Sequence, residues 1–181
     1  MSRYAAFLRG MNVGGHRITN ADLSACFAAL GFTDVACFRA SGNVVFAGER
    51  QSPAAVTARI EQGLQEALGY AVPTFVRTAE QVTAIAAASP FAAEQVAAST
   101  GKLHVALLSA APAAAAQRDV LSLHTERDRL AFGERALFWL PSGRMIESGL
   151  DLAAVERLLG PMTLRTKNTI EQIAAKHLAL G

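Results

Sequence analysis

The chain is poor in cysteine, and its few histidines are scattered. Only Cys26 and Cys37 are present, no CxxC pair occurs, and each cysteine is flanked by apolar residues. A four-ligand zinc site therefore has no cysteine framework, and we interpret both as buried free thiols. The four histidines show neither HxxxH nor HExxH spacing. The sequence thus predicts no metal site and no cofactor.

Long apolar runs and a strong charge imbalance are also missing. No stretch approaches the roughly 20 apolar residues that a membrane span needs, and the N-terminus "MSRYAAFLRGMN" lacks the apolar region of a signal peptide. We therefore expect a cytoplasmic protein with no membrane partner. The net charge of +2 is too small for electrostatics alone to imply a nucleic-acid partner.

Catalytic and nucleotide-binding motifs are absent from the sequence as well. No GxSxG elbow occurs, and neither GxGxxG nor GxxxxGK[ST] is found. Ser41 has no His or Asp at a motif-defined distance, so no catalytic residue is nominated. Whether the protein is an enzyme stays open at this point.

What is present is a hydrophobic chain with clear secondary-structure signals. With 51% hydrophobic residues in 181, it can bury a core and form one domain or two small ones. Alternation, capping residues and turn residues predict strands and helices in the order βαββαβ, followed by a connecting helix. The expected ranges are strand 4–9, helix 19–32, strands 34–40 and 43–48, helix 52–69, strand 72–78 and helix 79–90.

A similar order returns in the second half of the chain. Its expected elements are strand 102–109, helix 112–123, two strands within 128–141, helix 151–160, a short strand 162–168 and a closing helix 169–180. We therefore predict an α+β fold of two tandem ferredoxin-like (βαββαβ) halves with antiparallel sheets and a C-terminal helix. The halves are expected at 1–88 and 89–181.

The segment "RGMNVGG" at residues 9–15 is the first candidate site. In a βαββαβ half, a right-handed crossover places the loop after the first strand beside the hairpin "SGN" at 41–43. Glycine-rich amides ahead of a helix, with an arginine and asparagines nearby, favour an anion. An ordinary turn and hairpin tip would explain the same residues. The candidate ligand-binding residues at this edge are Arg9, Asn12, Gly14, Gly15, Ser41, Gly42 and Asn43.

The segment "TLRTKNTI" at 163–170 is the second polar concentration. Asn168 is explained as the N-cap of the closing helix, with Glu171 completing a capping box. Arg165 could pair with an acid or reach the first edge, and the sequence does not decide between these. Arg165, Asn168 and Thr169 complete the set of candidate ligand-binding residues.

Together, "RGMNVGG", "DLSACFAALGFTDVACFRASGNVVF" and "TLRTKNTI" resemble the bacterial proteins of domain of unknown function family 1697. The resemblance covers nearly the whole chain. It implies a bacterial cytoplasmic protein with ferredoxin-like halves, and it implies no reaction. One departure is Lys167, where the family often has a tryptophan.

Three functions remain open after this reading. The first is a binding module for an anionic or phosphate-bearing ligand, a small molecule or nucleic acid, at the edge formed by 9–15 and 41–43. The second is an enzyme in which Arg and Asn stabilise an oxyanion or a phosphate. The third gives these residues a structural role and places the function in protein interactions. The oligomeric state stays open.

Overall fold

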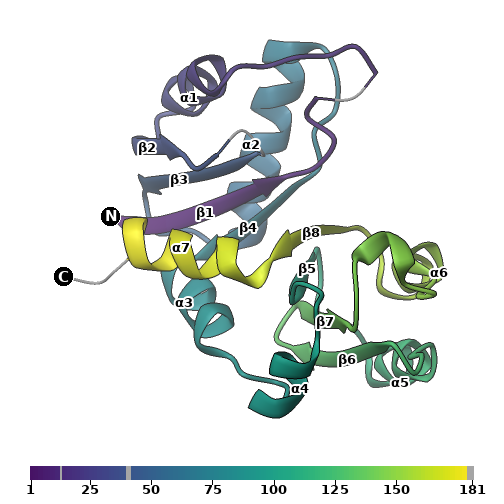
Figure 1. Ribbon diagram of the computed structural model, residues 1–181. Helices are drawn as coiled ribbons and strands as arrows, with labels where there is room; N and C mark the ends of the chain where they lie inside the picture. Colours follow the sequence, from purple (N-terminus) through teal and green to yellow (C-terminus); the bar gives the residue numbers. More distant parts are fainter. Residues whose placement is uncertain (13, 40–41, 179–181) are drawn as a thin grey trace. The chain divides into compact units, whose positions relative to one another are not determined.

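The computed structural model of the chain describes residues 1–12, 14–39 and 42–178 (Figure 1). Its helices and strands follow in this order: β1 (Ser2–Leu8), α1 (Asn20–Ala29), β2 (Thr33–Cys37), β3 (Asn43–Gly48), α2 (Pro53–Leu68), β4 (Thr74–Thr78), α3 (Ala79–Ala87), α4 (Ala93–Ala98), β5 (His104–Leu108), α5 (Ala114–Ser122), β6 (Asp128–Gly133), β7 (Ala136–Pro141), η1 (Met145–Glu147), α6 (Leu152–Leu159), β8 (Met162–Thr166) and α7 (Lys167–His177). The predicted α+β class, with two four-stranded antiparallel sheets and a C-terminal helix, is confirmed.

The chain divides into two compact units. The first contains Met1–Ala84 together with the chain from Gln172 onward, and the second contains Ile85–Glu171. The predicted halves, 1–88 and 89–181, place the boundary four residues later and keep the closing helix in the second half. The difference arises because α3 and α7 both run across a boundary without interruption, so no turn residue marks it.

Each unit holds one sheet with the same strand arrangement. The first sheet has the order β2-β3-β1-β4 and the second the order β6-β7-β5-β8. In the first, β1 pairs antiparallel with both β3 and β4, so that Phe7 faces Asn43 on one side and Phe75 on the other. This register brings the end of β1 to the start of β3, which is where the first candidate site lies.

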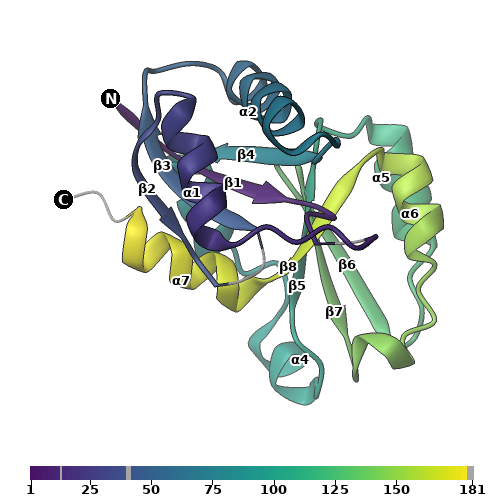
Figure 2. The same cartoon turned by 90° about the horizontal axis from the view of Figure 1, so that it is seen from above.

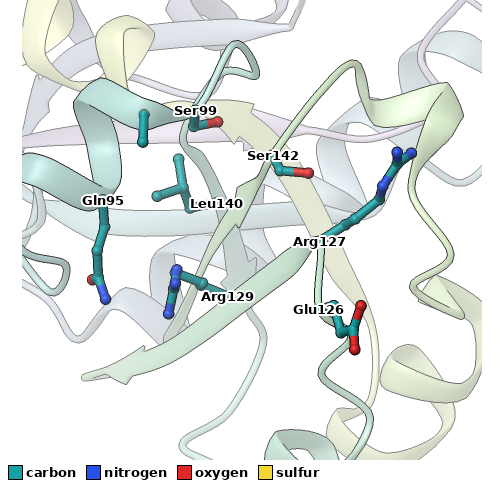
Figure 3. Close-up of a pocket in the computed structure, with 8 residues that line it drawn as sticks. Gln95, Ser99, Glu126, Arg127, Arg129, Leu140 and Ser142 are labelled. Atoms are coloured by element: carbon teal, nitrogen blue, oxygen red, sulfur yellow. The ribbon is translucent and has the colours of Figure 1, made fainter.

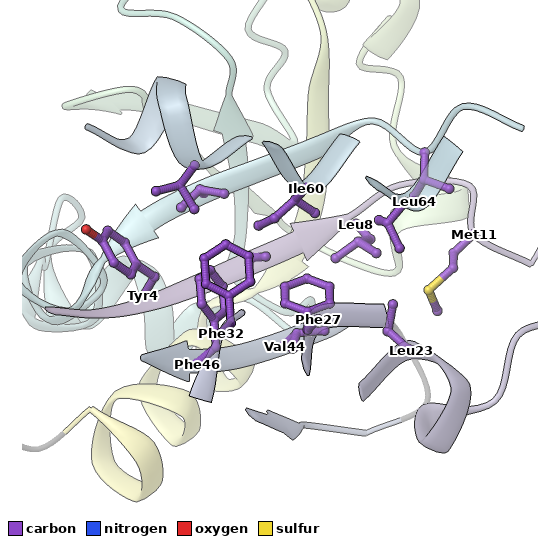
Figure 4. Close-up of a cluster of buried hydrophobic side chains, with 14 of the residues drawn as sticks. Tyr4, Leu8, Met11, Leu23, Phe27, Phe32, Val44, Phe46, Ile60 and Leu64 are labelled. Atoms are coloured by element: carbon purple, nitrogen blue, oxygen red, sulfur yellow. The ribbon is translucent and has the colours of Figure 1, made fainter. Parts of the chain in front are cut away.

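The core of the first unit lies between its sheet and the helices α1 and α2 (Figure 2). Alternate residues of each strand face this layer because side chains of a strand point to opposite faces in turn. In α2, Val56, Ile60 and Leu64 recur at helical spacing and are all buried. Figure 4 shows Phe27, Phe32 and Phe46 packed together between the helices and the strands, with Phe27 and Phe46 in an edge-to-face contact at 5.2 Å.

The second unit builds its core against α5 and α6 in the same way. Trp139 is 1% exposed, and its indole Nε1 donates to Asp128 Oδ1 at 2.7 Å. The Asp128 carboxylate also accepts from Thr125 Oγ1 at 2.6 Å and Ser148 Oγ at 2.7 Å. This buried carboxylate therefore joins the β6 start, β7 and the segment after η1.

Two expectations about helices need correction. The connecting helix 79–90 is shorter, α3, and a second helix, α4, follows it. The closing helix begins at Lys167, so Asn168 is not its N-cap. Thr166 takes that place, because its Oγ1 accepts from the backbone N–H of Thr169 at 3.3 Å. Among the residues that the structure describes, no helix has both the length and the apolar character to cross a membrane.

Candidate functional site

The loop after β1 is anchored at several points. The side-chain Oδ1 of Asn12 accepts from the backbone N–H of Ile18 at 3.0 Å and closes the loop on itself. Tyr70 donates its hydroxyl to the carbonyl of Met11 at 3.1 Å, and the ring of His16 stacks on Tyr70 with centroids 4.0 Å apart. Met11 and Ile18 are buried. The described residues on both sides of the loop are thus tied to the first unit.

The 38–43 hairpin adjoins this loop, as the topology predicted. Leu8 donates its backbone N–H to the carbonyl of Gly42 at 2.7 Å. Asn43 is 1% exposed and donates its side-chain Nδ2 to the carbonyl of Phe38 at 3.1 Å, which closes the hairpin. Ser41, the remaining candidate of this hairpin, lies outside the described residues.

The glycines of the two segments serve different purposes. Gly14 and Gly15 have φ angles of +66° and +85°, and an added Cβ at Gly15 would meet nothing within 4 Å. Their lack of a side chain is needed for the turn conformation alone. Gly42 has φ +70°, and a Cβ there would come within 3.1 Å of the Leu8 carbonyl oxygen. Gly42 therefore also permits the close approach of hairpin and strand.

Basic side chains gather on this loop without acidic ones beside them in sequence. Arg9, His16 and Arg17 are exposed, and no Asp or Glu occurs before Asp22. The charge of the loop is therefore positive over a continuous stretch of chain.

The N-terminus of the helix that follows is capped by side chains of the chain itself. Thr19 is the N-cap of α1, and its Oγ1 accepts from the backbone N–H of Asp22 at 3.1 Å. The Asp22 carboxylate accepts in turn from the Thr19 hydroxyl at 2.7 Å. A carboxylate and a hydroxyl already occupy the positive end of the helix dipole. The part that this helix end would take in holding an anion stays a prediction.

Arg39 is a cationic residue at the hairpin that sequence reasoning did not nominate. It is exposed, has φ +59°, and its Nη2 donates to Gln172 Oε1 at 2.8 Å. Its backbone carbonyl accepts from the side chain of Asn20 at 3.4 Å. The sequence pattern placed it in a strand, so no signal marked it as a loop residue.

The candidates at 165–169 belong to the second unit. Arg165 donates its Nη1 to Thr163 Oγ1 at 2.9 Å and to the Leu164 carbonyl at 2.8 Å. Burial lowers the pKa of its guanidinium to about 10. Asn168 is exposed and Thr169 is buried. Their association with the loop of the first unit stays a prediction.

Lys167, the departure from the family pattern, has two partners within the second unit. Its Nζ donates to the carbonyl of Ala86 at 2.7 Å and to Glu171 Oε1 at 2.6 Å. Only 8% of Lys167 is exposed. It holds the first turn of α7 to the end of α3, both within the second unit.

A hollow of the second unit was not predicted from the sequence. Figure 3 shows it lined by Arg129, Gln95, Ser99 and Ser142, with Arg129 and Gln95 extending side by side and Arg127 extending away. Its lining comes from residues 95–99, 126–129 and 140–142. No motif joins these three segments, so only the folded chain brings them together. No cluster of three or more His, Cys, Asp or Glu side chains suited to a metal ion occurs in the described part of the chain.

The structure is that of a two-unit α+β protein with exposed basic side chains on the loop after β1. A family profile, Protein of unknown function (DUF1697), matches residues 1–138. The chain belongs to this family.

One solved structure is similar over almost the full length. It is the conserved bacterial protein SP0830 from Streptococcus pneumoniae, with a TM-score of 0.73 and 23% sequence identity, over 96% of this chain and 97% of that one. This likeness shows the fold alone. No curated protein matches the chain.

Proposed function

We propose that the protein is a binding module for an anionic, phosphate-bearing ligand at the edge formed by residues 9–15 and 41–43. The observation that carries the proposal is the exposure of three basic side chains, Arg9, His16 and Arg17, on a loop that contacts of Asn12 and Tyr70 tie to the first unit. A preorganised loop loses little conformational entropy on binding. Guanidinium groups match phosphate oxygens with paired donors.

The nominated residues divide into two roles under this proposal. Arg9 and Arg17 would contact the ligand, joined by the amides near Gly14 and Gly15. Asn12 and Asn43 hold the loop and hairpin through the hydrogen bonds to Ile18 and Phe38. The candidates Arg165, Asn168 and Thr169 extend the site only if the two units present them to the same ligand.

We also infer that each half is a ferredoxin-like unit of a bacterial cytoplasmic protein. The support is the βαββαβ element order and the strand orders β2-β3-β1-β4 and β6-β7-β5-β8. The family resemblance supports the bacterial origin.

The test is ligand binding by the double variant Arg9→Ala/Arg17→Ala. Wild-type protein is titrated with inorganic phosphate, nucleotides, short single-stranded RNA and DNA, and small carboxylates, with melting temperature and calorimetry as readouts. The matched control is Arg3→Ala, an exposed arginine at the opposite end of β1. We expect one ligand class to stabilise wild type and the control, and the double variant to lose this effect.

Salt dependence distinguishes the ligands further. Binding to a nucleic acid should weaken as salt rises, in proportion to the phosphates contacted. Equal binding by wild type and the double variant, or none by wild type, would refute the proposal. Turnover of a bound phosphate ester would favour the enzymatic alternative.

A structural role is the second candidate, and it is favoured by the bond that closes the hairpin. Asn43 is buried and satisfies the Phe38 carbonyl. Replacement of Asn43 by alanine should lower the free energy of unfolding by about 1–3 kcal/mol, the usual effect of an unsatisfied buried polar group. If wild type binds no ligand while Asn43→Ala melts at a lower temperature, the polar residues and glycines at 9–15 and 41–43 have a structural role.

A further inference from the structure

The open edge of strand β6 in the second unit lies in a groove of about 650 Å³. Four consecutive strand residues, Asp128 to Ala131, line it. Successive side chains of a strand point to opposite faces. Four in a row can therefore share one groove only if the groove runs along the edge of the strand and not across one face.

The groove has a wall on each side of that edge. On the face of Arg129 the wall is formed by Pro90, Phe91 and Gln95, from the segment that leads into and through α4. On the face of Leu130 it is formed by the C-terminal end of α5 and the residues after it. An extended peptide segment could therefore lie along β6 between these two walls. We call this space the slot.

The backbone of β6 presents hydrogen-bonding groups along its open edge, at Leu130 within the groove and at Phe132 just past its lining. Ser142 donates to the carbonyl of Arg127 at 2.6 Å, which marks that pair as hydrogen-bonded in the β6–β7 ladder. Hydrogen-bonded and non-bonded pairs alternate in an antiparallel ladder. In the register Leu130 opposite Trp139 and Phe132 opposite Leu137, both are non-bonded pairs. The N–H and C=O groups of Leu130 and Phe132 therefore point away from β7.

The pairing on the far side of β7 agrees with this assignment. Leu108 donates to the carbonyl of Arg135 at 3.0 Å, so the hydrogen-bonded pairs between β5 and β7 include Ala106 with Leu137. The backbone N–H and C=O of Leu137 therefore bond to β5 and not to β6. No strand lies on the open side of β6 in the described ranges.

Both walls are held firmly. Ser99 donates its hydroxyl to the Pro141 carbonyl, and Thr100 donates its Oγ1 to the Ser142 carbonyl at 3.0 Å. A Cβ on Gly101 would come within 2.5 Å of the Pro141 carbonyl oxygen, so glycine allows this close approach. On the other side the Asp128 carboxylate fixes Thr125 at 2.6 Å. The chain after α4 and the turn before β6 are therefore both tied to the part of the unit that carries the groove.

Charge indicates what would fill the slot. Arg129 is exposed, and its guanidinium forms no hydrogen bond or ion pair within the described part of the chain. Two carboxylates line the groove as well: Asp128 is buried and engaged by three donors, and Glu126 is exposed and precedes β6. Of the charged side chains on the strand itself, Arg129 is the one that an added strand would meet. Phe91 and Leu130 supply apolar surface. An added strand would thus pair an acidic side chain with Arg129 and set apolar ones beside it.

We propose that the open edge of β6 binds an extended peptide segment of a partner protein, as an added antiparallel or parallel strand that carries an acidic residue among apolar ones. Main-chain hydrogen bonds to Leu130 and Phe132 would supply affinity, and Arg129 would supply selectivity. This inference is independent of the anion site of the first unit.

The test is selection of displayed random peptides of six residues, the length of β6, on the full chain. Enriched peptides are resynthesised, and their binding is measured with the charge-reversal variant Arg129→Glu. The matched control is Arg118→Glu, an exposed arginine of α5 that does not line the groove. We expect acidic, apolar peptides whose affinity falls by about tenfold or more in Arg129→Glu and stays unchanged in Arg118→Glu.

Amide hydrogen exchange supplies the second readout. The N–H groups of Leu130 and Phe132 should become protected when peptide is added, while that of Ala131, already bonded to β7, should change little. Leu130→Pro removes an outward N–H that β7 does not use, which edge strands tolerate, and it should abolish binding. Absence of any enriched peptide, equal affinity in Arg129→Glu, or no new protection at Leu130 and Phe132 would overturn the proposal. So would self-association of the chain through this edge in place of peptide binding.

Discussion

Replacement of Asp128 by asparagine should destabilise the second unit in a pH-dependent manner. The Asp128 carboxylate is 1% exposed and receives three hydrogen bonds, from Trp139 Nε1, Ser148 Oγ and Thr125 Oγ1. Burial raises the pKa of this carboxyl group, but the hydrogen bonds from Ser148, Thr125 and Trp139 outweigh that effect and the pKa lies below its ordinary value. The ionised form is therefore the one the fold prefers.

The size of the effect follows from the donors. The side-chain oxygen of asparagine can still accept from the Trp139 indole. Its NH₂ group, however, takes the place of the carboxylate oxygen that accepted from the Thr125 hydroxyl. The hydroxyl must rotate to accept, and the charge that strengthened all three bonds is gone. Hydrogen bonds to a charged group contribute about 1.5–3 kcal/mol, against about 0.5–1.5 for neutral pairs. We expect Asp128→Asn to lower the free energy of unfolding by about 1–3 kcal/mol at neutral pH.

The sign of the pH dependence is fixed by the lowered pKa. A group whose pKa is lower in the folded protein contributes its full stability above its unfolded pKa, about 3.9 for Asp. This contribution is lost as the pH falls from there through the folded pKa. The difference between wild type and Asp128→Asn should therefore be constant near neutrality and shrink in acid.

Urea unfolding followed by tryptophan fluorescence measures both quantities. Trp139 is the single tryptophan of the chain, so its signal reports the second unit directly. The control is Asp119→Asn, an exposed carboxylate of α5. Equal stability of wild type and Asp128→Asn at pH 7 would refute this reasoning. A difference that persists undiminished below about pH 3 would do so as well.

Three further outcomes are expected. Gly42→Ala should destabilise the first unit by about 1–2 kcal/mol in thermal unfolding, because φ is +70° and the new Cβ would meet Leu8; Gly15→Ala, with open space around it, shares the backbone strain without that contact. Lys167→Met should lower stability by about 1–2 kcal/mol through loss of the bond to Ala86, while a neutral result would show that packing alone holds this residue. His104 should titrate by NMR below the ordinary value of about 6.5, since burial, followed by the nearby Lys102 charge, lowers its pKa; a midpoint above that value would contradict the burial.

Helices with strong local signals could be predicted from the sequence almost to the residue. Ser52 and Pro53 predict the start of α2, Gly69 predicts its end, and the structure has these residues as N-cap, first turn and left-handed C-cap. The six-residue helix α4 was missed. Its N-cap, Ala92, offers no capping side chain, and so short a helix depends on tertiary contacts more than on its own sequence.

The sequence predicted which segments of the candidate site lie next to each other. It did not predict the hydrogen bonds that their side chains form. Crossover handedness alone brings the loop of Asn12 beside the hairpin of Asn43, and the Leu8–Gly42 hydrogen bond confirms this. Which polar groups the fold uses internally depends on distances that a sequence does not contain. The groove beside β6 illustrates the same limit, because residues 90–99 and 121–131 share no motif and meet only through the fold.

The two units share a short sequence repeat at the same position of their sheets. The fourth strand of each sheet ends in Arg-Thr, directly followed by a helix: Arg77 and Thr78 before α3, Arg165 and Thr166 before α7. The arginines occupy equivalent places, opposite Ala5 in one sheet and Val105 in the other. Each donates its Nη1 to the carbonyl of the preceding residue, at 2.9 and 2.8 Å.

The threonines repeat the pattern one residue further along. Thr78 Oγ1 accepts from the backbone of Gln81, and Thr166 Oγ1 accepts from that of Thr169, both at 3.3 Å. Arg165 was nominated as a ligand residue, yet its counterpart Arg77 makes the same bond in a unit where nothing nominated it. The threonines therefore cap the first turn of each helix, and the arginines make the same bond to the strand in both units. Arg77→Lys and Arg165→Lys should therefore both lower the melting temperature. Arg77→Lys is the control for ligand binding. If Arg165→Lys loses binding while Arg77→Lys, destabilised to the same extent, keeps it, then Arg165 contacts the ligand directly.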